Sequence, residues 1–221
     1  MEATTYRLNG SEYVGAFATA TDRYVFAGSN MPDKSFNVLE EMLHVKPVRI
    51  TVSDSNLIGI LARANSNGLL LSNLAFDFEV EHIKSLGLEI NIGVLESDLN
   101  AIGSNIAAND RIALVNPEYG AESVKQIGDI LGVEVVKVDI GGMKTVGANN
   151  ILTNKGFVIN NRSSDTEKET LDRILGLKSV RTTANRGSVA IGLSAIANSN
   201  AIVVGDETTG YELDRLLEAL E

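Results

Sequence analysis

The sequence predicts a mixed α/β fold, a closed ring of five pseudosymmetric ββαβ units with helices on the outside. Three observations predict it: a unit that recurs five times, the same order of elements in each unit, and a last strand that the fifth unit lacks but the N-terminus supplies. The chain has 221 residues, and five units of about 44 residues use nearly all of it. We therefore expect one domain over residues 1–221.

The repeat is marked by an aliphatic residue followed by glycine. The intervals between successive glycines are 44, 44, 44 and 45 residues, for Gly15, Gly59, Gly103, Gly147 and Gly192. A turn-forming pair follows each glycine at a fixed distance, and an apolar run comes next. Because glycine in a strand lets another backbone approach closely, we expect these glycines in the first strand of each unit, crowded around the ring axis.

The third unit shows the order of elements. It predicts a strand at 100–108, a turn, a buried strand at 112–116, a helix at 121–131 and a third strand at 133–138. Gly132 is placed to end the helix in a left-handed conformation, and Gly87, Gly176 and His44 take that place in other units. The remaining units predict helices at 36–43, 78–86, 167–175 and 211–220, and third strands at 48–52, 88–94 and 177–182.

The fifth unit ends in its helix, so its third strand is missing. Residues 4–9 precede the first unit and read as a strand. Pairing this strand with the fifth unit closes the ring and removes exposed sheet edges. Two of the helices begin with capping boxes, Ser164 with Glu167 and Thr209 with Glu212.

Composition excludes several classes of function. The chain contains no cysteine, which excludes disulfides, thiolate metal sites and a cysteine nucleophile. It has no apolar run long enough to span a membrane, and its N-terminus lacks the features of a signal peptide, so we expect a cytoplasmic protein. The net charge of −10 is wrong for a general nucleic-acid coat or a DNA-binding protein. A net negative charge favours binding to a basic protein, or it serves only to keep the protein soluble.

No set of residues predicts catalysis. The sequence has neither a P-loop nor a dinucleotide-binding fingerprint, so we expect no cofactor. His44 and His82 have no metal-ligand spacing, and we expect neither a metal nor an enzymatic activity. The acids Asp206 and Glu207 precede a helix, where their negative charges interact favourably with the helix dipole.

Two features suit an interaction surface. Three amide-rich pairs lie beside the first strands and should gather near one end of the ring axis: Ser104 with Asn105, Asn149 with Asn150, and Asn185 with Arg186. Their side chains either contact the polar surface of another molecule or form hydrogen bonds within their own turns. In addition, every charge between Arg173 and Val204 is positive. This stretch suits RNA phosphate, with a solvated edge as the alternative; its candidates are Lys178, Arg181, Asn185 and Arg186.

The sequence resembles the archaeal translation initiation factor 6 family, which has the pentein fold. The resemblance covers the whole chain and is carried by the strings at 109–115 (NDRIALV), 153–156 (TNKG), 184–188 (ANRGS) and 208–213 (TTGYEL). It implies binding to the joining face of the large (50S) ribosomal subunit, which prevents association with the small subunit. A role in large-subunit biogenesis is implied by eukaryotic members.

The resemblance also implies partners. It implies a ribosomal protein of the uL14 type, near the sarcin–ricin loop of the large rRNA, with Ile60 and Ser104 on the contact surface and Asp110 nearby. With the amide-rich spots added, the expected protein-binding residues are Ile60, Ser104, Asn105, Asp110, Asn149 and Asn150. A closed ring leaves no edge that demands a partner copy, so we expect a monomer.

Two other functions stay open at this point. One is a scaffold ring that binds some other basic protein. The second is a pentein enzyme that modifies guanidino groups, but those enzymes attack with cysteine, and this chain has none.

Overall fold

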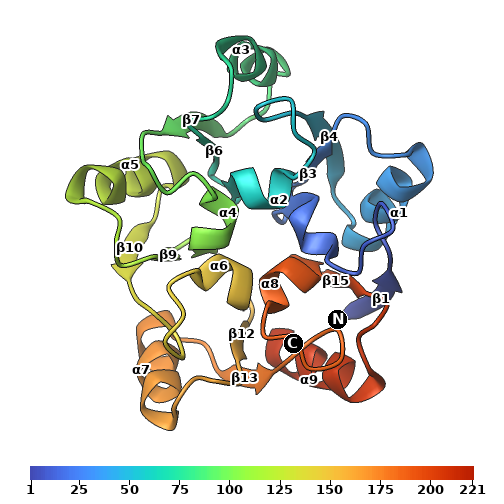
Figure 1. Cartoon of the computed structure of the whole chain (residues 1–221), viewed down its shortest axis with the longest axis vertical. Helices are drawn as coiled ribbons and strands as arrows, with labels where there is room; N and C mark the ends of the chain where they lie inside the picture. The colour runs from blue at the N-terminus through green and yellow to red at the C-terminus, as the bar shows by residue number, and fades with distance from the viewer.

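A computed structural model of the chain describes all 221 residues and has five three-stranded sheets around one axis (Figure 1). The sheets lie like spokes, with short helices at the centre and long helices at the periphery. In every sheet the first and second strands are antiparallel and the second and third are parallel. The predicted fold class is confirmed.

Each unit contributes five elements. The short inner helices are η1 (Val14–Ala16), α2 (Ile58–Leu61), α4 (Ile102–Asn105), α6 (Val146–Asn149) and α8 (Ile191–Ser194). The first strands are β2 (Ala18–Ala20), β5 (Ala62–Ala64), β8 (Ile106–Ala108), β11 (Ile151–Leu152) and β14 (Ala195–Ala197). The second strands are β3 (Tyr24–Gly28), β6 (Gly68–Ser72), β9 (Ile112–Val115), β12 (Phe157–Asn160) and β15 (Ala201–Gly205).

The outer elements complete the units. The long helices are α1 (Asp33–Leu43), α3 (Asp77–Ser85), α5 (Ala121–Leu131), α7 (Asp165–Leu175) and α9 (Gly210–Leu220). The third strands are β4 (Lys46–Ile50), β7 (Asn91–Leu95), β10 (Glu134–Lys137), β13 (Ser179–Thr182) and β1 (Glu2–Tyr6). The left-handed helix ends are confirmed at His44, Gly132 and Gly176, whose φ angles are 54°, 64° and 64°.

The N-terminal strand closes the ring as predicted. β1 pairs in parallel with β15, from Glu2 opposite Ala201 to Tyr6 opposite Gly205. The strand begins two residues before the predicted 4–9 and ends earlier, because Asn9 and Gly10 have positive φ angles of 50° and 78° and form a turn.

The predicted first strand of the third unit is partly wrong. Residues 102–105 form the one-turn helix α4, and only residues 106–108 are strand. The other units have the same short helix before the first strand. A short apolar run has no periodicity that separates a helical turn from a strand, so the sequence pattern could not distinguish them.

The repeat glycines nevertheless crowd around the axis. A Cβ atom on Gly59 would lie 1.8 Å from the carbonyl oxygen of Gly15, and one on Gly103 would lie 1.9 Å from that of Gly59. Gly147, Gly192 and Gly15 meet the preceding glycine of the ring in the same way, at 2.1, 1.9 and 2.2 Å. The expected close approach is therefore confirmed, in the short helices instead of the strands.

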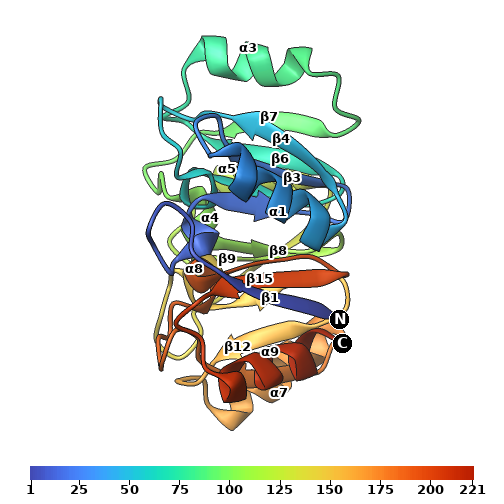
Figure 2. The same cartoon turned by 90° about the vertical axis from the view of Figure 1, so that its right-hand side faces the viewer.

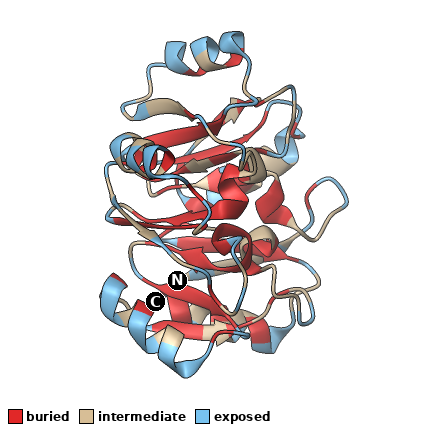
Figure 3. Cartoon of the chain, turned by 60° about the vertical axis from the view of Figure 1, so that its left-hand side comes forward, coloured by how far each residue is buried: buried red, intermediate tan, exposed pale blue.

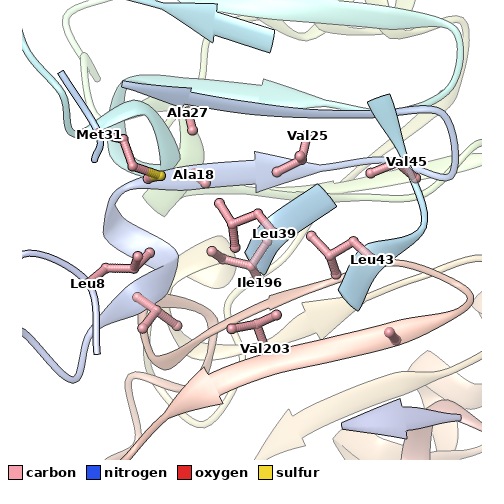
Figure 4. Close-up of a cluster of buried hydrophobic side chains, with 12 residues drawn as sticks. Leu8, Ala18, Val25, Ala27, Met31, Leu39, Leu43, Val45, Ile196 and Val203 are labelled. Atoms are coloured by element: carbon pink, nitrogen blue, oxygen red, sulfur yellow. The ribbon is translucent and has the colours of Figure 1, made fainter. Parts of the chain in front are cut away.

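The hydrophobic core consists of five clusters between neighbouring sheets. The cluster in Figure 4 joins Leu39 and Leu43 of α1 to Ile196 and Val203 of the fifth unit. The first and second strands are largely buried and the third strands only partly, whereas the outer faces of the long helices are exposed (Figure 3). Because each cluster is shared by two units, no unit buries its apolar surface alone, and the ring should unfold as one cooperative body.

The ring has two different ends, visible from the side in Figure 2. We call one the helix end, because the five short helices and the loops before them lie there. The opposite one is the turn end, formed by the turns at 21–23, 65–67, 109–111, 153–155 and 198–200. Both chain termini lie at the turn end, where Met1 contacts Glu221.

Removal of residues 1–10 should destabilise the whole protein. The deletion removes β1, so the inner strand β15 loses its parallel partner, and it removes Leu8 from a core cluster. We expect a clearly lower Tm in a single cooperative transition, measured by circular dichroism. An unchanged Tm would contradict closure of the ring by β1.

Candidate functional site

The helix end brings together residues from neighbouring units. Ile60 lies in α2, Ser104 in α4 and Asn149 in α6, and these three helices follow one another around the axis. Ile60 is half-buried, whereas Ser104 retains only 9% of its accessible surface. The residues that follow the repeat glycines therefore form the middle of one compact face.

The amide side chains at this end are occupied within the ring. Asn105 donates to the carbonyl oxygen of Ala101 and accepts a hydrogen bond from Asn116, at 3.0 and 2.7 Å. Asn150 donates to Val146 and accepts from the backbone and side chain of Asn160. These buried amide groups need their hydrogen bonds within the ring. What they contribute to contact with another molecule is therefore the shape of the face.

Asn149 is also satisfied inside the ring. Its side-chain oxygen accepts from the Thr145 hydroxyl at 2.8 Å, and its amide donates to the carbonyl oxygen of Val189 at 3.2 Å. This second bond links the fourth unit to the loop of the fifth. Asn149 therefore holds two neighbouring loops of the helix end in register.

Asp110 does not join these residues, because it lies at the turn end. Its carboxylate accepts from the backbone N–H of Ser66 at 2.8 Å and from the amide of Asn154 at 2.7 Å. The strand β8 separates it from Ser104, and the two residues stand at its opposite ends. One flat contact surface cannot include both.

The basic stretch is also divided by the fold. Lys178 is exposed before β13 at the turn end, and Arg186 lies beyond β13 at the helix end. Arg181, within β13, forms an ion pair with Asp165. A strand carries its two ends to opposite faces of the ring, so charges close in sequence are separated in space.

Within the basic stretch, Arg186 is the cation that lies at the helix end. Its side chain is 73% exposed and pairs with Glu207 at 2.9 Å. The adjacent Asn185 anchors the loop by donating to the carbonyl oxygen of Glu12 at 2.9 Å. Both Asn185 and Arg186 have positive φ angles, 46° and 57°, so the loop needs external hydrogen bonds to hold this conformation.

The carboxylate of Glu212 supplies these bonds. It accepts from the backbone N–H groups of Arg186 and Gly187, at 3.2 and 2.8 Å, and from the hydroxyl of Thr183 at 2.7 Å. It also completes the predicted capping box with Thr209, which is confirmed. One buried carboxylate thus fixes both the start of α9 and the Arg186 loop.

Two other units use the same device. Glu79 accepts from the N–H groups of Ser53 and Asp54, and Glu167 accepts from that of Gly141 and completes the predicted box with Ser164. Burial raises the pKa of Glu79 and Glu212, but backbone and hydroxyl hydrogen bonds outweigh it, so the pKa of each lies below its usual range. Hydrogen bonds from Ser164 lower the pKa of Glu167.

Replacing Glu212 with glutamine should destabilise the protein at neutral pH by on the order of 2 kcal/mol, because charge-assisted bonds to five donors are lost or reversed. A lowered pKa stabilises the folded state above the unfolded pKa of about 4.3, and that stability is lost as the pH falls through the folded pKa. The difference in stability between the wild type and Glu212→Gln should therefore become smaller at acidic pH.

Urea unfolding at pH 7 and below pH 4 measures this difference. Glu218→Gln is the matched control on the same helix, because Glu218 is half-exposed and pairs only with Arg215. It should change stability by less than about 0.5 kcal/mol. If Glu212→Gln loses the same stability relative to the wild type at both pH values, the carboxylate does not have this role.

The helix end is acidic at its rim and apolar near its middle. Exposed acids in its loops include Asp54, Asp98 and Asp139. Three of its cations form ion pairs: Arg7 with Asp206 and Glu207, Arg186 with Glu207, and Lys144 with Glu118. Leu57, at the start of α2, is 38% exposed beside Ile60. Such a face suits a basic partner with some apolar surface.

Sequence reasoning missed two contributors to this end. Leu57 sits one residue before Ile58 and was hidden among core aliphatic residues, although its equivalents in other units are Tyr13, Ala101, Thr145 and Ala190. Glu79 was missed because its N-cap residue is Phe76, which has no side-chain acceptor to complete a capping box. Its place three residues into the helix, as in Glu167 and Glu212, was the available signal.

The structure offers no group of three or more His, Cys, Asp or Glu side chains that could hold a metal ion. None of its helices has the length and apolar character that a membrane crossing requires.

The fold has a known structural relative. A crystal structure of a dimethylarginine dimethylaminohydrolase variant, as an adduct with S-methyl-L-thiocitrulline, superposes with a TM-score of 0.50. The superposition covers 99% of this chain and 95% of that chain at 10% sequence identity. At this identity the likeness shows the pentein fold alone.

Sequence comparison reaches further. The profile of the eIF-6 family matches residues 3–219. The protein named translation initiation factor 6 of Pyrococcus abyssi is 38% identical over 214 residues, covering 95% of this chain and 94% of the relative. The protein of the same name from Methanosarcina mazei is 36% identical over 217 residues, covering 98% and 97%. This chain, with its closed ring of five units, therefore belongs to the eIF-6 family of translation initiation factors.

Proposed function

We propose that the protein binds the joining face of the large ribosomal subunit through its helix end and thereby prevents association with the small subunit. The whole-length match to the eIF-6 family, over residues 3–219, carries this proposal. The chain and the initiation factors named above match over nearly the whole length of each.

The charge of the helix end supports a ribosomal protein as the main contact. Ribosomal proteins are basic as a class, and the exposed acids around Ile60 would attract such a surface. Leu57 and Ile60 supply the apolar middle that interface cores use. A protein of the uL14 type, beside the sarcin–ricin loop, fits this chemistry.

We propose that the contact with rRNA is smaller than the contact with the ribosomal protein. Of the basic candidates, Arg186 alone projects from the helix end with a largely exposed side chain, and Asn185 stands beside it in the anchored loop. Lys178 and Arg181 lie elsewhere on the ring, so the proposal assigns phosphate contact to Arg186.

The proposed activity requires occupancy and no chemistry. A body seated on the joining face excludes the other subunit, and apparent association weakens by one plus the ratio of free factor to its Kd. The enzyme alternative lacks a nucleophile, because the chain contains no cysteine, and we expect no turnover of arginine, agmatine or methylarginine.

Sedimentation of the purified protein with separated 50S and 30S subunits tests the proposal. We expect it to migrate with free 50S subunits and to lower the yield of 70S particles in proportion to its occupancy. Migration with 30S alone, or with neither subunit, would contradict it. In the latter case a scaffold ring for another basic protein becomes the better explanation of the acidic face.

Arg186→Ala should weaken 50S binding and reduce its salt dependence. Loss of one phosphate contact lowers the slope of log K against log salt by up to about one unit. Lys178→Ala removes the same charge from the turn end and should leave both affinity and slope unchanged. Binding measured across a salt series separates the two variants; if Arg186→Ala matches the wild type throughout, Arg186 contacts no phosphate.

A further inference from the structure

The axis of the ring contains a small cavity with a cation at its side. The cavity has a volume of about 40 Å³ and is lined by glycines of the short helices and by alanine and larger aliphatic residues of the first strands, together with Thr19, Arg63 and Asn150. One water needs roughly 10–15 Å³ on this measure, so the space accommodates roughly three particles of that size. It is too small for an organic ligand.

Arg63 is an exception in the repeat. It stands four residues after Gly59, and the equivalent positions in the other units hold Thr19, Ala107, Ile151 and Ile196. The Arg63 side chain borders the cavity and is partly buried, with its Nε inaccessible to solvent. It donates one hydrogen bond, to the carbonyl oxygen of Gly103, and its Nε has no partner among the protein atoms.

The charge of Arg63 has no counterion in the protein. None of the ion pairs includes it. Burial lowers its pKa to about 10, and no carboxylate opposes that shift. Since this value remains well above 7, the guanidinium stays charged under physiological conditions. A partly buried charge whose one hydrogen-bond partner in the protein is a carbonyl group is only partly compensated.

A second polar group faces the same space. Thr19 is 3% exposed, lines the cavity, and its Oγ1 has no hydrogen-bond partner in the protein. It comes from β2, which is adjacent to β5, the strand of Arg63. Two unpartnered donors from neighbouring units therefore converge on one small cavity, and such groups call for a ligand that accepts hydrogen bonds.

We propose that the axial cavity is a binding site for a monatomic anion of the chloride type. The guanidinium of Arg63 would donate from Nε and supply the opposite charge, and the Thr19 hydroxyl would donate from a second side. Water alone would satisfy the donors but would leave the charge uncompensated, which is why an anion is favoured. Such an ion would join two units at the axis and stabilise the closed ring.

The path to the cavity affects the experiment. A further cavity of about 20 Å³ continues toward the turn end, where Asp22 and Asp110 border it. These carboxylates repel anions, so we expect slow exchange in the folded protein. The protein should therefore be unfolded in urea and refolded in the presence of the halide that is tested.

Crystallography of the full chain, refolded and crystallised in sodium bromide, gives a direct readout. We expect an anomalous bromide peak in the cavity within hydrogen-bond distance of Arg63. Density for water alone, without an anomalous signal, would overturn the proposal.

Urea unfolding in solution gives a second readout. At constant ionic strength, replacing gluconate with chloride should raise the folding equilibrium constant of the wild type in proportion to chloride above its Kd. Arg63→Met and the isosteric Thr19→Val should lose or weaken this response. Arg111→Met is the control: Arg111 is exposed and also donates to one carbonyl oxygen, that of Leu175, so its loss should leave the response intact. Equal responses in the wild type and Arg63→Met would refute the site.

Discussion

Replacing Gly103 with alanine should abolish folding or lower the stability by more than about 4 kcal/mol. The new Cβ would lie 1.9 Å from the carbonyl oxygen of Gly59 and 2.6 Å from that of Ala62, and both are backbone atoms. In an open structure the neighbouring unit could move away. In a closed ring the displacement of one unit compresses the next, because each repeat glycine meets its neighbour in the same way.

Gly210→Ala is the control for this substitution. Gly210 is the first residue of α9, and a Cβ there would meet no atom within 4 Å. Alanine favours the helix and restricts the unfolded chain, so we expect unchanged or slightly higher stability, by up to about 1 kcal/mol. Soluble yield and urea unfolding compare the two variants. If Gly103→Ala folds with wild-type stability, the glycines do not set the spacing of the units at the axis.

Ile60→Glu should weaken binding to the large subunit at least about tenfold, or about 1.4 kcal/mol. Ile60 lies in the middle of the helix end, half-buried beside the exposed Leu57. A carboxylate there would have to be desolvated in the middle of an interface, where single residues have the largest effects. The expected result rests on the proposed function and is measured as 50S affinity by sedimentation or fluorescence.

Asn200→Glu adds the same charge at the turn end. Asn200 is exposed, and its side chain makes no hydrogen bond within the protein. This variant should bind like the wild type, which separates an effect of position from an effect of total charge. Equal loss of affinity in both variants would show that repulsion of the whole acidic body, instead of contact at the helix end, weakens binding.

The sequence by itself determined the architecture of this protein. The glycine interval of 44 or 45 residues set the number of units, the spare N-terminal strand implied closure, and the long helices were placed with at most three residues of error at their starts. These features follow from local chemistry: helical periodicity, helix caps and turn residues act within a few positions of the chain. They could therefore be predicted without any long-range contact.

Only the tertiary structure decided which residues share a surface. It separated Asp110 from Ser104, and Lys178 from Arg186, because strands about ten ångströms long carry chain neighbours to opposite ends of the ring. It paired Arg186 with Glu207 and turned Asn105 and Asn150 inward. It also placed Arg63 at the axis without a counterion. Charge and hydrogen-bond satisfaction depend on partners distant in sequence, and those partners are fixed only when the ring closes.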